Sequence, residues 1–348
     1  MAEIRDVVNH RAFVGLSLIR HSMKAILLVG GMGTRLRPLT YRIPKPLVPI
    51  LDKPLILRVI ESIPREVDEI IIPIGYKMDT MQEYFDENPP PREVTLVEER
   101  QPMGTGGAVK NVEGHLDDSF LVINGDSISS LDLDRFVEFH RRKGGVASIS
   151  LWEVEDPTPF GIVDLDQDDR ILRFQEKPKR EEAFSKLINA GVYALEQEVL
   201  DHIGEGFVSM EREVFPNILD KGMYGLRFDG YWIDCGTREN LLTAYRTLMR
   251  GDAESVRSPP GAVSATPPSV VSDSAEIGEG ATVGPFAYIS EGVVVGPRSR
   301  VEGSVLFEGA RIGADCHIID SIVDKDVSVS PGTVVRSQIL SNSTPEDP

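Results

Sequence analysis

The chain contains almost no cysteine. Its 348 residues include two, Cys235 and Cys316, which lie far apart and lack the short spacing of a metal-binding pair. This argues against a disulfide-stabilised fold and a cysteine-ligated metal, and it favours a reducing compartment, so we expect a cytoplasmic protein. The sequence also lacks an apolar run near the roughly 18 residues that a membrane-spanning helix needs, so no membrane partner is expected.

Positive charge is also scarce. Lysine and arginine number 37 against 55 aspartates and glutamates, which gives a formal net charge of -18 and a pI of about 4.8. A strongly acidic surface repels polyanions, so nucleic acid is not expected as a partner. Any phosphate-binding site must therefore be a local cluster of positive groups in a negative protein.

The length favours two domains, and the character of the sequence changes near residue 250. Residues 1–22 are interpreted as an N-terminal extension that is poorly ordered. Over residues 23–250 short apolar runs alternate with helical patterns, which predicts an α/β domain with a Rossmann-like mixed open sheet. Strands rich in isoleucine and valine without alternation are typical of a parallel sheet buried on both faces. The expected strands are 25–29, 69–74, 94–96, 120–123 and 147–152, and the expected helices are 55–63, 80–85, 107–112, 133–142 and 238–249.

A proline- and serine-rich stretch, interpreted as a linker over residues 251–269, precedes a repetitive region at 270–340 and a tail at 341–348. The repeat places an apolar residue at every sixth position, often followed by glycine or serine, and this predicts a short left-handed parallel β-helix. A short β-helix has exposed ends, so we expect a homo-oligomer. The inward positions are expected to be Val271, Ile277, Val283, Ile289, Val295, Val301 and Phe307, followed less regularly by Ile312, Ile318, Val329 and Val335.

The segment 28–47 is the strongest candidate for a phosphate site. An apolar run ends at Leu28–Val29 and is followed by Gly30, Gly31 and Gly33, whose backbone N–H groups lie open to an anion. Arg35, Arg37 and Lys45 then add positive charge, and Pro44 and Pro46 restrict the backbone around Lys45. The loop is not a Walker A loop, and Leu36 stands where a dinucleotide fingerprint needs its third glycine. Taken alone, the glycines fit a tight turn equally well.

Polar residues later in the domain could complete a site. Asp126 ends a buried strand and Asp234 lies near the end of the domain, and two carboxylates beside a triphosphate are suited to Mg²⁺. Between them, Glu176 and Asn189 could bond sugar hydroxyls, and Lys177 could meet a sugar phosphate. Singly, each residue fits a turn cap or a solvated charge as well.

In this order the segments resemble the nucleoside-diphosphate-sugar pyrophosphorylases, also called sugar-1-phosphate nucleotidyltransferases. The resemblance spans residues 23–250, and the hexapeptide region matches a common extension of that family. The matching segments are Gly30-Gly-Met-Gly-Thr-Arg-Leu-Arg-Pro-Leu-Thr40, Pro44-Lys-Pro-Leu47, Gly104-Thr-Gly-Gly-Ala108, Asn124-Gly-Asp126, Glu176-Lys-Pro178, Asn189-Ala-Gly191 and Trp232-Ile-Asp-Cys-Gly-Thr237.

The resemblance implies nucleotidyl transfer from a nucleoside triphosphate to a sugar 1-phosphate, with pyrophosphate as the second product. It implies that Arg35 holds the leaving pyrophosphate, that Lys45 offsets charge at the α-phosphate, and that Asp126 and Asp234 carry Mg²⁺. The residues implied to bind substrates are Leu28, Gly30, Gly31, Gly33, Gln101 and Gly106 on the nucleotide, and Gly161, Glu176, Lys177 and Asn189 on the sugar phosphate.

The sequence favours GTP and mannose 1-phosphate as substrates, because Gly104-Thr-Gly-Gly107 and the short hexapeptide region resemble guanylyl-transferring members of the family. Thymidylyl or uridylyl transfer to glucose 1-phosphate is the alternative within the family. A non-catalytic regulatory subunit of the same fold is a second hypothesis. Acyl transfer by the repeat region, with His317 as the base, is a third.

Overall fold

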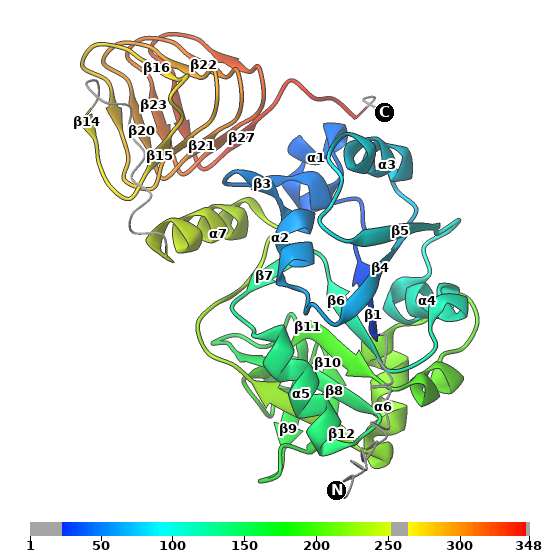
Figure 1. Ribbon diagram of the computed structural model, residues 1–348. Coiled ribbons are helices and arrows are strands. Elements are labelled where there is room, and N and C mark those ends of the chain that lie inside the picture. The colour runs from blue at the N-terminus through cyan, green and yellow to red at the C-terminus, as the bar shows by residue number, and fades with distance from the viewer. Residues whose placement is uncertain (1–22, 252–263, 346–348) are drawn as a thin grey trace, which may run out of the picture.

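The computed structural model describes residues 23–251 and 264–345, and these form a sheet-containing domain and a β-helix (Figure 1). The expected N-terminal extension and most of the expected linker lie outside the described residues. Helix α7 (Arg238–Gly251) lies between the two domains, next to the β-helix. Among the described residues, no helix combines the length and the apolar character needed to cross a bilayer.

The first domain is built on one mixed sheet of nine strands. Its path is β10-β9-β11-β6-β1-β4-β5; off this path β8 pairs with β11, and β12 pairs with β8. Strands β6, β1, β4 and β5 are parallel, whereas β11 runs antiparallel to β6 and β8. The mixed sheet is therefore confirmed, although the residue pattern alone favoured a wholly parallel one. The strands are β1 (Met23–Leu28), β4 (Val67–Ile74), β5 (Glu93–Glu98), β6 (Phe120–Asn124), β8 (Ala147–Glu153), β9 (Gly161–Leu165), β10 (Ile171–Glu176), β11 (Leu187–Leu195) and β12 (Met223–Arg227).

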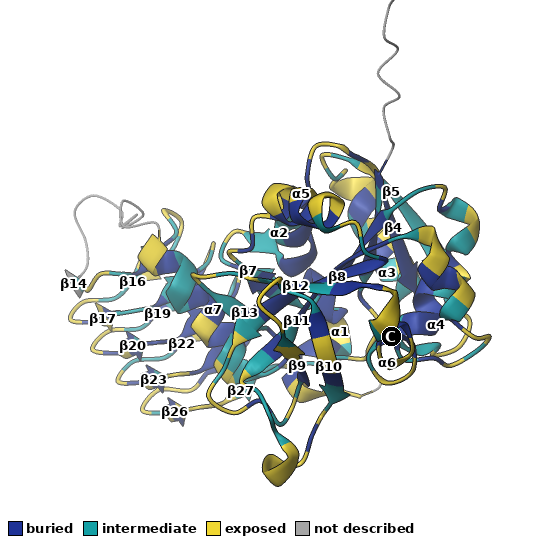
Figure 2. Ribbon diagram, turned by 90° about the horizontal axis from the view of Figure 1, so that it is seen from below, coloured by how far each residue is buried: buried dark blue, intermediate teal, exposed yellow. Residues whose placement is uncertain are grey.

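Helices cover both faces of the sheet. Neighbouring residues of a strand point to opposite sides, so one strand contributes apolar side chains to the contacts on both faces. In β1, Ala25 and Leu27 join the apolar cluster that contains α2, α3 and α5, while Ile26 joins the cluster under α4 and α6. Figure 2 shows the strands largely buried and the exposed residues on the outer faces of the helices. These helices are α1 (Leu39–Arg42), α2 (Leu55–Ser62), α3 (Met78–Glu87), α4 (Gly104–Asn111), α5 (Leu133–Lys143) and α6 (Phe215–Ile218).

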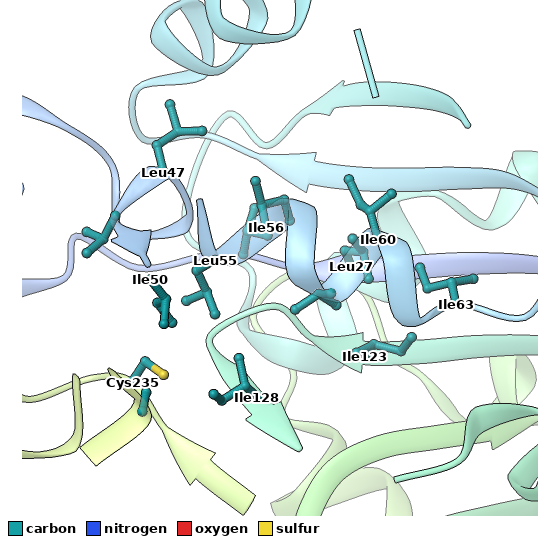
Figure 3. Packing of buried hydrophobic residues seen from close by; sticks show 14 of the residues in the cluster. Leu27, Leu47, Ile50, Leu55, Ile56, Ile60, Ile63, Ile123, Ile128 and Cys235 are labelled. Atoms are coloured by element: carbon teal, nitrogen blue, oxygen red, sulfur yellow. The ribbon is translucent and has the colours of Figure 1, made fainter. Parts of the chain in front are cut away.

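The apolar cluster around α2 supports the segment that follows the glycine loop. Ile50 and Leu55 lie near Ile128 and Cys235, and Leu47 belongs to the same cluster (Figure 3). Burial raises the pKa of the Cys235 thiol to about 12, so this cysteine stays protonated and serves as a small apolar residue. The packing of this cluster therefore holds in place the backbone that carries Lys45 and Asp234.

The second domain is a parallel β-helix of three sheets, with orders β14-β17-β20-β23-β26, β15-β18-β21-β24-β27 and β16-β19-β22-β25. The period shortens after Val301, because Ile289 pairs with Leu306 and not with Phe307. Leu306 therefore points into the prism, and the expectation for Phe307 was wrong by one residue. The strands are β14 (Ser264–Ala265), β15 (Val270–Val271), β16 (Glu276–Ile277), β17 (Thr282–Val283), β18 (Tyr288–Ile289), β19 (Val294–Val295), β20 (Arg300–Glu302), β21 (Val305–Leu306), β22 (Arg311–Ile312), β23 (His317–Ile319), β24 (Ile322–Val323), β25 (Ser328–Val329), β26 (Val334–Arg336) and β27 (Ile339–Leu340).

One sheet of the β-helix packs against the first domain, and its outward residues show why. Phe307 is buried in the apolar cluster of the first domain, and the Tyr245 and Tyr288 rings meet at 5.3 Å between centroids. In the other two sheets most of the outward positions are polar or charged. The outward residues of the contact sheet are Val270, Tyr288, Val305, Ile322 and Ile339.

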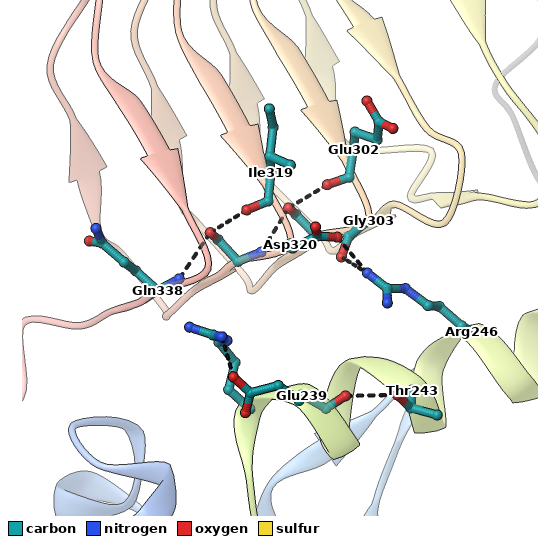
Figure 4. Close-up of polar contacts among 11 residues, drawn as sticks. Glu239, Thr243, Arg246, Glu302, Gly303, Ile319, Asp320 and Gln338 are labelled. Carbon is teal, nitrogen blue, oxygen red and sulfur yellow. Dashed lines mark hydrogen bonds and ion pairs between the residues drawn. The ribbon is translucent and has the colours of Figure 1, made fainter.

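Ion pairs surround this apolar contact. Arg246 of α7 donates to the Gly303 carbonyl at 3.3 Å and to Asp320 Oδ1 at 2.6 Å (Figure 4). Arg42 at the end of α1 donates to the buried carboxylate of Asp324 at 2.8 Å. The β-helix is therefore attached close to the segment that carries the candidate phosphate loop.

Candidate active site

The glycine loop leaves open space beyond the end of β1. A Cβ added to Gly30 would have its nearest neighbour at 3.9 Å, and one added to Gly31 would meet nothing within 4 Å. Gly33 differs, because its φ is +60° and an added Cβ would lie 3.0 Å from the Thr40 side chain. The Thr40 hydroxyl donates to the Gly33 carbonyl at 2.8 Å, which folds the loop back toward Lys45. A ligand could approach the first two glycines, while the third fixes the turn.

Backbone pairing brings the two aspartates to this loop. Leu28 pairs with Asn124, and the Gly125 N–H donates to the Leu28 carbonyl at 2.9 Å, so Asp126 emerges beside the glycines. Strand β13 (Trp232–Asp234) pairs antiparallel with β7 (Ser127–Ser129), and this pairing carries Asp234 alongside Asp126. Both carboxylates therefore lie at the carboxyl edge of the parallel strands, where open α/β sheets bind ligands.

Lys45 lies between the two carboxylates. Its Nζ donates to Asp126 Oδ2 at 2.8 Å and lies 3.5 Å from Asp234 Oδ1. Lys45 is 9% exposed, and η2 (Lys45–Leu47) holds it over the apolar cluster around α2. Arg35 Nη2 lies 3.5 Å from the other oxygen of Asp234, and this side chain is largely exposed. The four side chains form a compact charged cluster that faces the glycine loop.

Gly236 makes room for this cluster. A Cβ at this position would lie 2.4 Å from Arg35 Nη2 and 2.8 Å from Asp234 Oδ1. Contacts that short force neighbouring atoms to move, so any larger residue would push Arg35 off Asp234. The glycine of the Asp234-Cys-Gly236 segment therefore has a steric reason that the sequence did not show.

The cluster fits a divalent cation whose remaining ligands are phosphate oxygens. Asp234 Oδ1 is buried without a hydrogen-bond partner, and the Lys45 ammonium already stands as a cation between the carboxylates. Within 23–251 and 264–345, no group of three or more acidic, histidine or cysteine side chains is arranged to hold a metal. The protein would supply two carboxylates, and a hard cation would take its other oxygens from the substrate or water.

The expected sugar-binding residues lie on β9, at and just after the end of β10, and on β11. Gly161 allows the Glu176 carboxylate to lie close, since an added Cβ would be 2.8 Å from Glu176 Oε2. Burial raises the pKa of the Glu176 carboxyl, and the negative charge of Glu211 adds to that effect. The Lys177 side chain is exposed, and its backbone N–H donates to the Phe160 carbonyl at 2.9 Å. Asn189 Oδ1 accepts the Gly191 N–H at 2.9 Å.

Of the groups expected to read the base, the backbone of residues 28–30 lies at the end of β1, Gln101 lies beyond β5, and Gly106 lies in α4. Gln101 is exposed and follows Glu99, whose side chain is the nearest group to Gly30. Gly106 is buried, and its N–H donates to the Val208 carbonyl at 2.8 Å. That N–H is therefore already bonded, so Gly106 can serve a base only by its small size or its other atoms. His317, the residue weighed as an acyl-transfer base, is exposed on β23 of the β-helix and not at this site.

Several residues near the site were not singled out from the sequence. Thr105 belongs to a quoted motif segment and Tyr193 follows another by two residues, but their hydroxyls gave no signal of their own. Glu211 lies in the π-helical turn η6 (Met210–Val214) and accepts hydrogen bonds from both hydroxyls. A charged residue in a short helical turn looks solvated in sequence, so only the structure shows its contacts.

The sequence matches two family models. Residues 24–251 match the model described as nucleotidyl transferase, and residues 265–344 match the model described as GMPPB C-terminal domain. The mannose-1-phosphate guanylyltransferase of Mycobacterium tuberculosis is 36% identical over 313 residues, which cover 86% of this chain and 83% of that protein. Mannose-1-phosphate guanylyltransferase 1 of Arabidopsis thaliana is 36% identical over 315 residues, with 86% of each chain covered.

Solved structures show the same first domain. HddC from Yersinia pseudotuberculosis in complex with GMP-PN superposes with a TM-score of 0.56 at 30% identity. The match covers 65% of this chain and 99% of HddC, so it concerns the sheet-containing domain and not the β-helix.

Proposed function

Because this chain belongs to the nucleotidyl transferase family, as a sugar-1-phosphate nucleotidyltransferase, we propose that it transfers the guanylyl group of GTP to mannose 1-phosphate. The products are GDP-mannose and pyrophosphate. The observation that carries the proposal is Lys45, held between Asp126 and Asp234 beside an open glycine loop. The choice of GTP and mannose 1-phosphate rests on the relatives of both domains.

The reaction is an in-line displacement at phosphorus. A phosphate oxygen of the sugar 1-phosphate attacks the α-phosphorus of GTP, and the bond from that phosphorus to the β-bridging oxygen breaks. We assign to the Lys45 ammonium, which lies beside both aspartates, the offset of the negative charge that increases on the α-phosphate in the transition state. Arg35, exposed beside Asp234, holds the leaving pyrophosphate. Leu28, Gly30, Gly31 and Gly33 line the approach of the triphosphate.

Both substrates are anions, so the site has to overcome their repulsion before it can align them. Lys177 takes the phosphate of the sugar, while Glu176, Asn189 and the Gly161 backbone bind its hydroxyls. Members of this family normally use a divalent metal, and we propose Mg²⁺ held by Asp126 and Asp234. When bound, such a cation would supply positive charge that offsets the repulsion between the phosphates. Gln101 and the space at Gly106 contact the guanine.

The test is pyrophosphate release by the full chain over a grid of nucleotides and sugar phosphates. GTP, UTP and dTTP are each paired with mannose 1-phosphate and glucose 1-phosphate, with MgCl₂ or with EDTA. We expect the highest kcat/KM for GTP with mannose 1-phosphate and no turnover in EDTA. A higher kcat/KM for UTP or dTTP with glucose 1-phosphate would reject the substrates but keep the reaction. No turnover with any pair would reject the catalytic function.

We also propose an oligomeric state, a cellular location and domain limits for this chain. We propose that the β-helix forms the contact of a homo-oligomer, since Val334 on its last coil is 56% exposed. Light scattering after gel filtration should give a mass above 38.4 kDa, and a monomer would reject this.

Two buried free thiols support a cytoplasmic location, which cell fractionation checks. The domain limits of 23–250 and 270–340 predict that proteolysis cuts first within residues 251–269.

A further inference from the structure

Three hydroxyl groups converge on the carboxylate of Glu211. Thr105 Oγ1 donates to Glu211 Oε2 at 2.7 Å, and Ser209 Oγ donates to the same oxygen at 2.8 Å. The Tyr193 hydroxyl donates to Glu211 Oε1 at 3.1 Å. Thr105 comes from α4, Tyr193 from β11, and Ser209 from the turn that leads into η6. One side chain therefore joins three elements that are distant in sequence.

The carboxylate sets the direction of the hydrogen bonds that lead away from it. An ionised carboxylate only accepts, so the Tyr193 hydroxyl must donate to it and can accept only from elsewhere. It accepts from Asn189 Nδ2 at 2.8 Å, while Asn189 Oδ1 accepts the Gly191 N–H. The Asn189 amide is thus fixed in one orientation, and one of its two N–H bonds remains for a sugar hydroxyl.

The same logic fixes the nucleotide side. The Thr105 hydroxyl donates to Glu211 and accepts the Met210 N–H at 2.9 Å. The Val208 carbonyl accepts from Gly106 at 2.8 Å and Gly107 at 3.2 Å, so the chain before η6 is tied along α4. Tyr193 is fully buried, which makes an unsatisfied hydroxyl there costly. The network is closed on both sides, and Glu211 is its shared acceptor.

We propose that Glu211 is a positioning residue that holds the nucleotide-binding segment 104–107 and the sugar-binding Asn189 in register with each other. The proposal rests on the proposed function, because it assigns those two segments to the two substrates. Glu211 touches neither substrate in this scheme and acts through Thr105 on one side and Tyr193 on the other. The two substrates are brought into line by one carboxylate behind them.

The variants that test this are Glu211→Gln, Thr105→Val and Tyr193→Phe, with Glu213→Gln as the matched control. Glutamine keeps the shape but places N–H bonds where hydroxyl hydrogens now point, so at least one donor loses its acceptor. Thr105→Val and Tyr193→Phe each remove one of the hydroxyls that donate to Glu211. Glu213 is exposed, lies two residues away and accepts the Ser209 N–H at 3.0 Å, so its variant removes a charge from the same turn but leaves the Thr105 and Tyr193 bonds to Glu211 in place.

The kinetic readout is KM for each substrate against kcat. Glu211→Gln is expected to raise both KM values about tenfold, the effect of losing one charge-assisted hydrogen bond, with kcat changed far less. Tyr193→Phe should raise KM for the sugar phosphate alone, and Thr105→Val should raise KM for the nucleotide alone. Glu213→Gln should change neither. The assignment is wrong if Glu211→Gln leaves both KM values as in wild type. It is also wrong if Thr105→Val and Tyr193→Phe each raise both KM values by the same factor.

Amide hydrogen exchange of the ligand-free full chain gives a readout independent of turnover. Glu211→Gln should speed exchange about tenfold in peptides covering both 104–111 and 187–195, and Glu213→Gln should not. Faster exchange confined to 209–214 overturns the proposal even if the enzyme is active. If wild type turns over no substrate pair, the proposed function fails, and the exchange pattern still decides whether Glu211 couples the two segments.

Discussion

Replacing Lys45 by methionine is the sharpest test of the candidate active site. Methionine keeps most of the side-chain volume and removes the charge that now lies 2.8 Å from Asp126 and 3.5 Å from Asp234. The matched control is Lys53→Met, since Lys53 also pairs with a carboxylate, Glu61, at 2.8 Å but is well exposed. Both variants lose one positive charge, and only one loses it inside the charged cluster.

The structure gives the size of the expected effect on turnover. Lys45 is 9% exposed, so its ammonium acts in a site partly shielded from water, where an oriented charge has a large effect. Removing one such group from a developing negative charge typically lowers kcat about 10²- to 10³-fold, or roughly 3–4 kcal/mol. We expect a loss of that size for Lys45→Met, and less than twofold for Lys53→Met.

The expected effect on stability is much smaller. Losing Lys45 leaves Asp126 uncompensated and Asp234 paired only with the exposed Arg35, which destabilises the folded state, but it also removes the desolvation cost of the ammonium. The Asp126 side chain is 44% exposed and can be hydrated, so we expect a loss of about 1–2 kcal/mol. The apolar packing around Leu47 and Cys235 remains in place.

The assay measures pyrophosphate release at saturating substrates, together with urea unfolding of each variant. A Lys45→Met rate within tenfold of wild type would refute the role of this lysine at the reacting phosphate. A loss of turnover that accompanies unfolding would refute the view that Lys45 is a functional and not a structural cation. Equal losses in Lys45→Met and Lys53→Met would point to net charge as the cause.

Three further predictions concern the sugar side, the domain contact and pH. Gly161→Ala brings a Cβ within 2.8 Å of Glu176 Oε2, so KM for the sugar phosphate should rise about tenfold, whereas Gly114→Ala, with open space around it, should leave KM unchanged. Phe307→Ala should lower the free energy of unfolding in urea by about 3 kcal/mol, because this ring is buried in the cluster of the other domain. Burial lowers the pKa of the His140 imidazole below 6.5, so the unfolded chain binds the proton first as pH falls. The free energy of unfolding should therefore drop between pH 7 and pH 5, and less so in His140→Gln.

Local patterns predicted much of the fold. The run that ends β6 and the helical pattern of α5 were expected within a residue or two of where they lie, because their signals are contained in neighbouring residues. Asp132 caps α5 by accepting the Arg135 N–H, and Gly144 ends it at φ +64°. The hexapeptide period likewise predicted the β-helix, since each coil repeats the same local rule.

A mixed sheet was predicted, but strands β9, β10 and β12 of its antiparallel half were not identified from the sequence. Strands β9 and β10 are short, mixed in polarity and pair with each other as a hairpin, and β12 pairs with β8, which is distant in the chain, so the apolar pattern did not identify them. The prediction that Phe307 points into the β-helix was wrong because the length of each coil is set by the three-dimensional packing. A six-residue period continues past Val301 in the sequence, but the coil closes one residue earlier and turns Phe307 toward the other domain.

By itself, the sequence determined which residues could form the site and the family of reactions they suit, because the glycine loop and the motifs with Lys45, Asp126 and Asp234 are contiguous segments with characteristic spacing. The tertiary structure decided how those segments meet. Strand pairing places Asp234 beside Asp126, and the packing of the segment that carries Lys45 places its ammonium between the two carboxylates. It also decided that Glu211 stands behind both substrate segments, because a hydrogen bond depends on distance and direction in space, and neither is written in the order of residues.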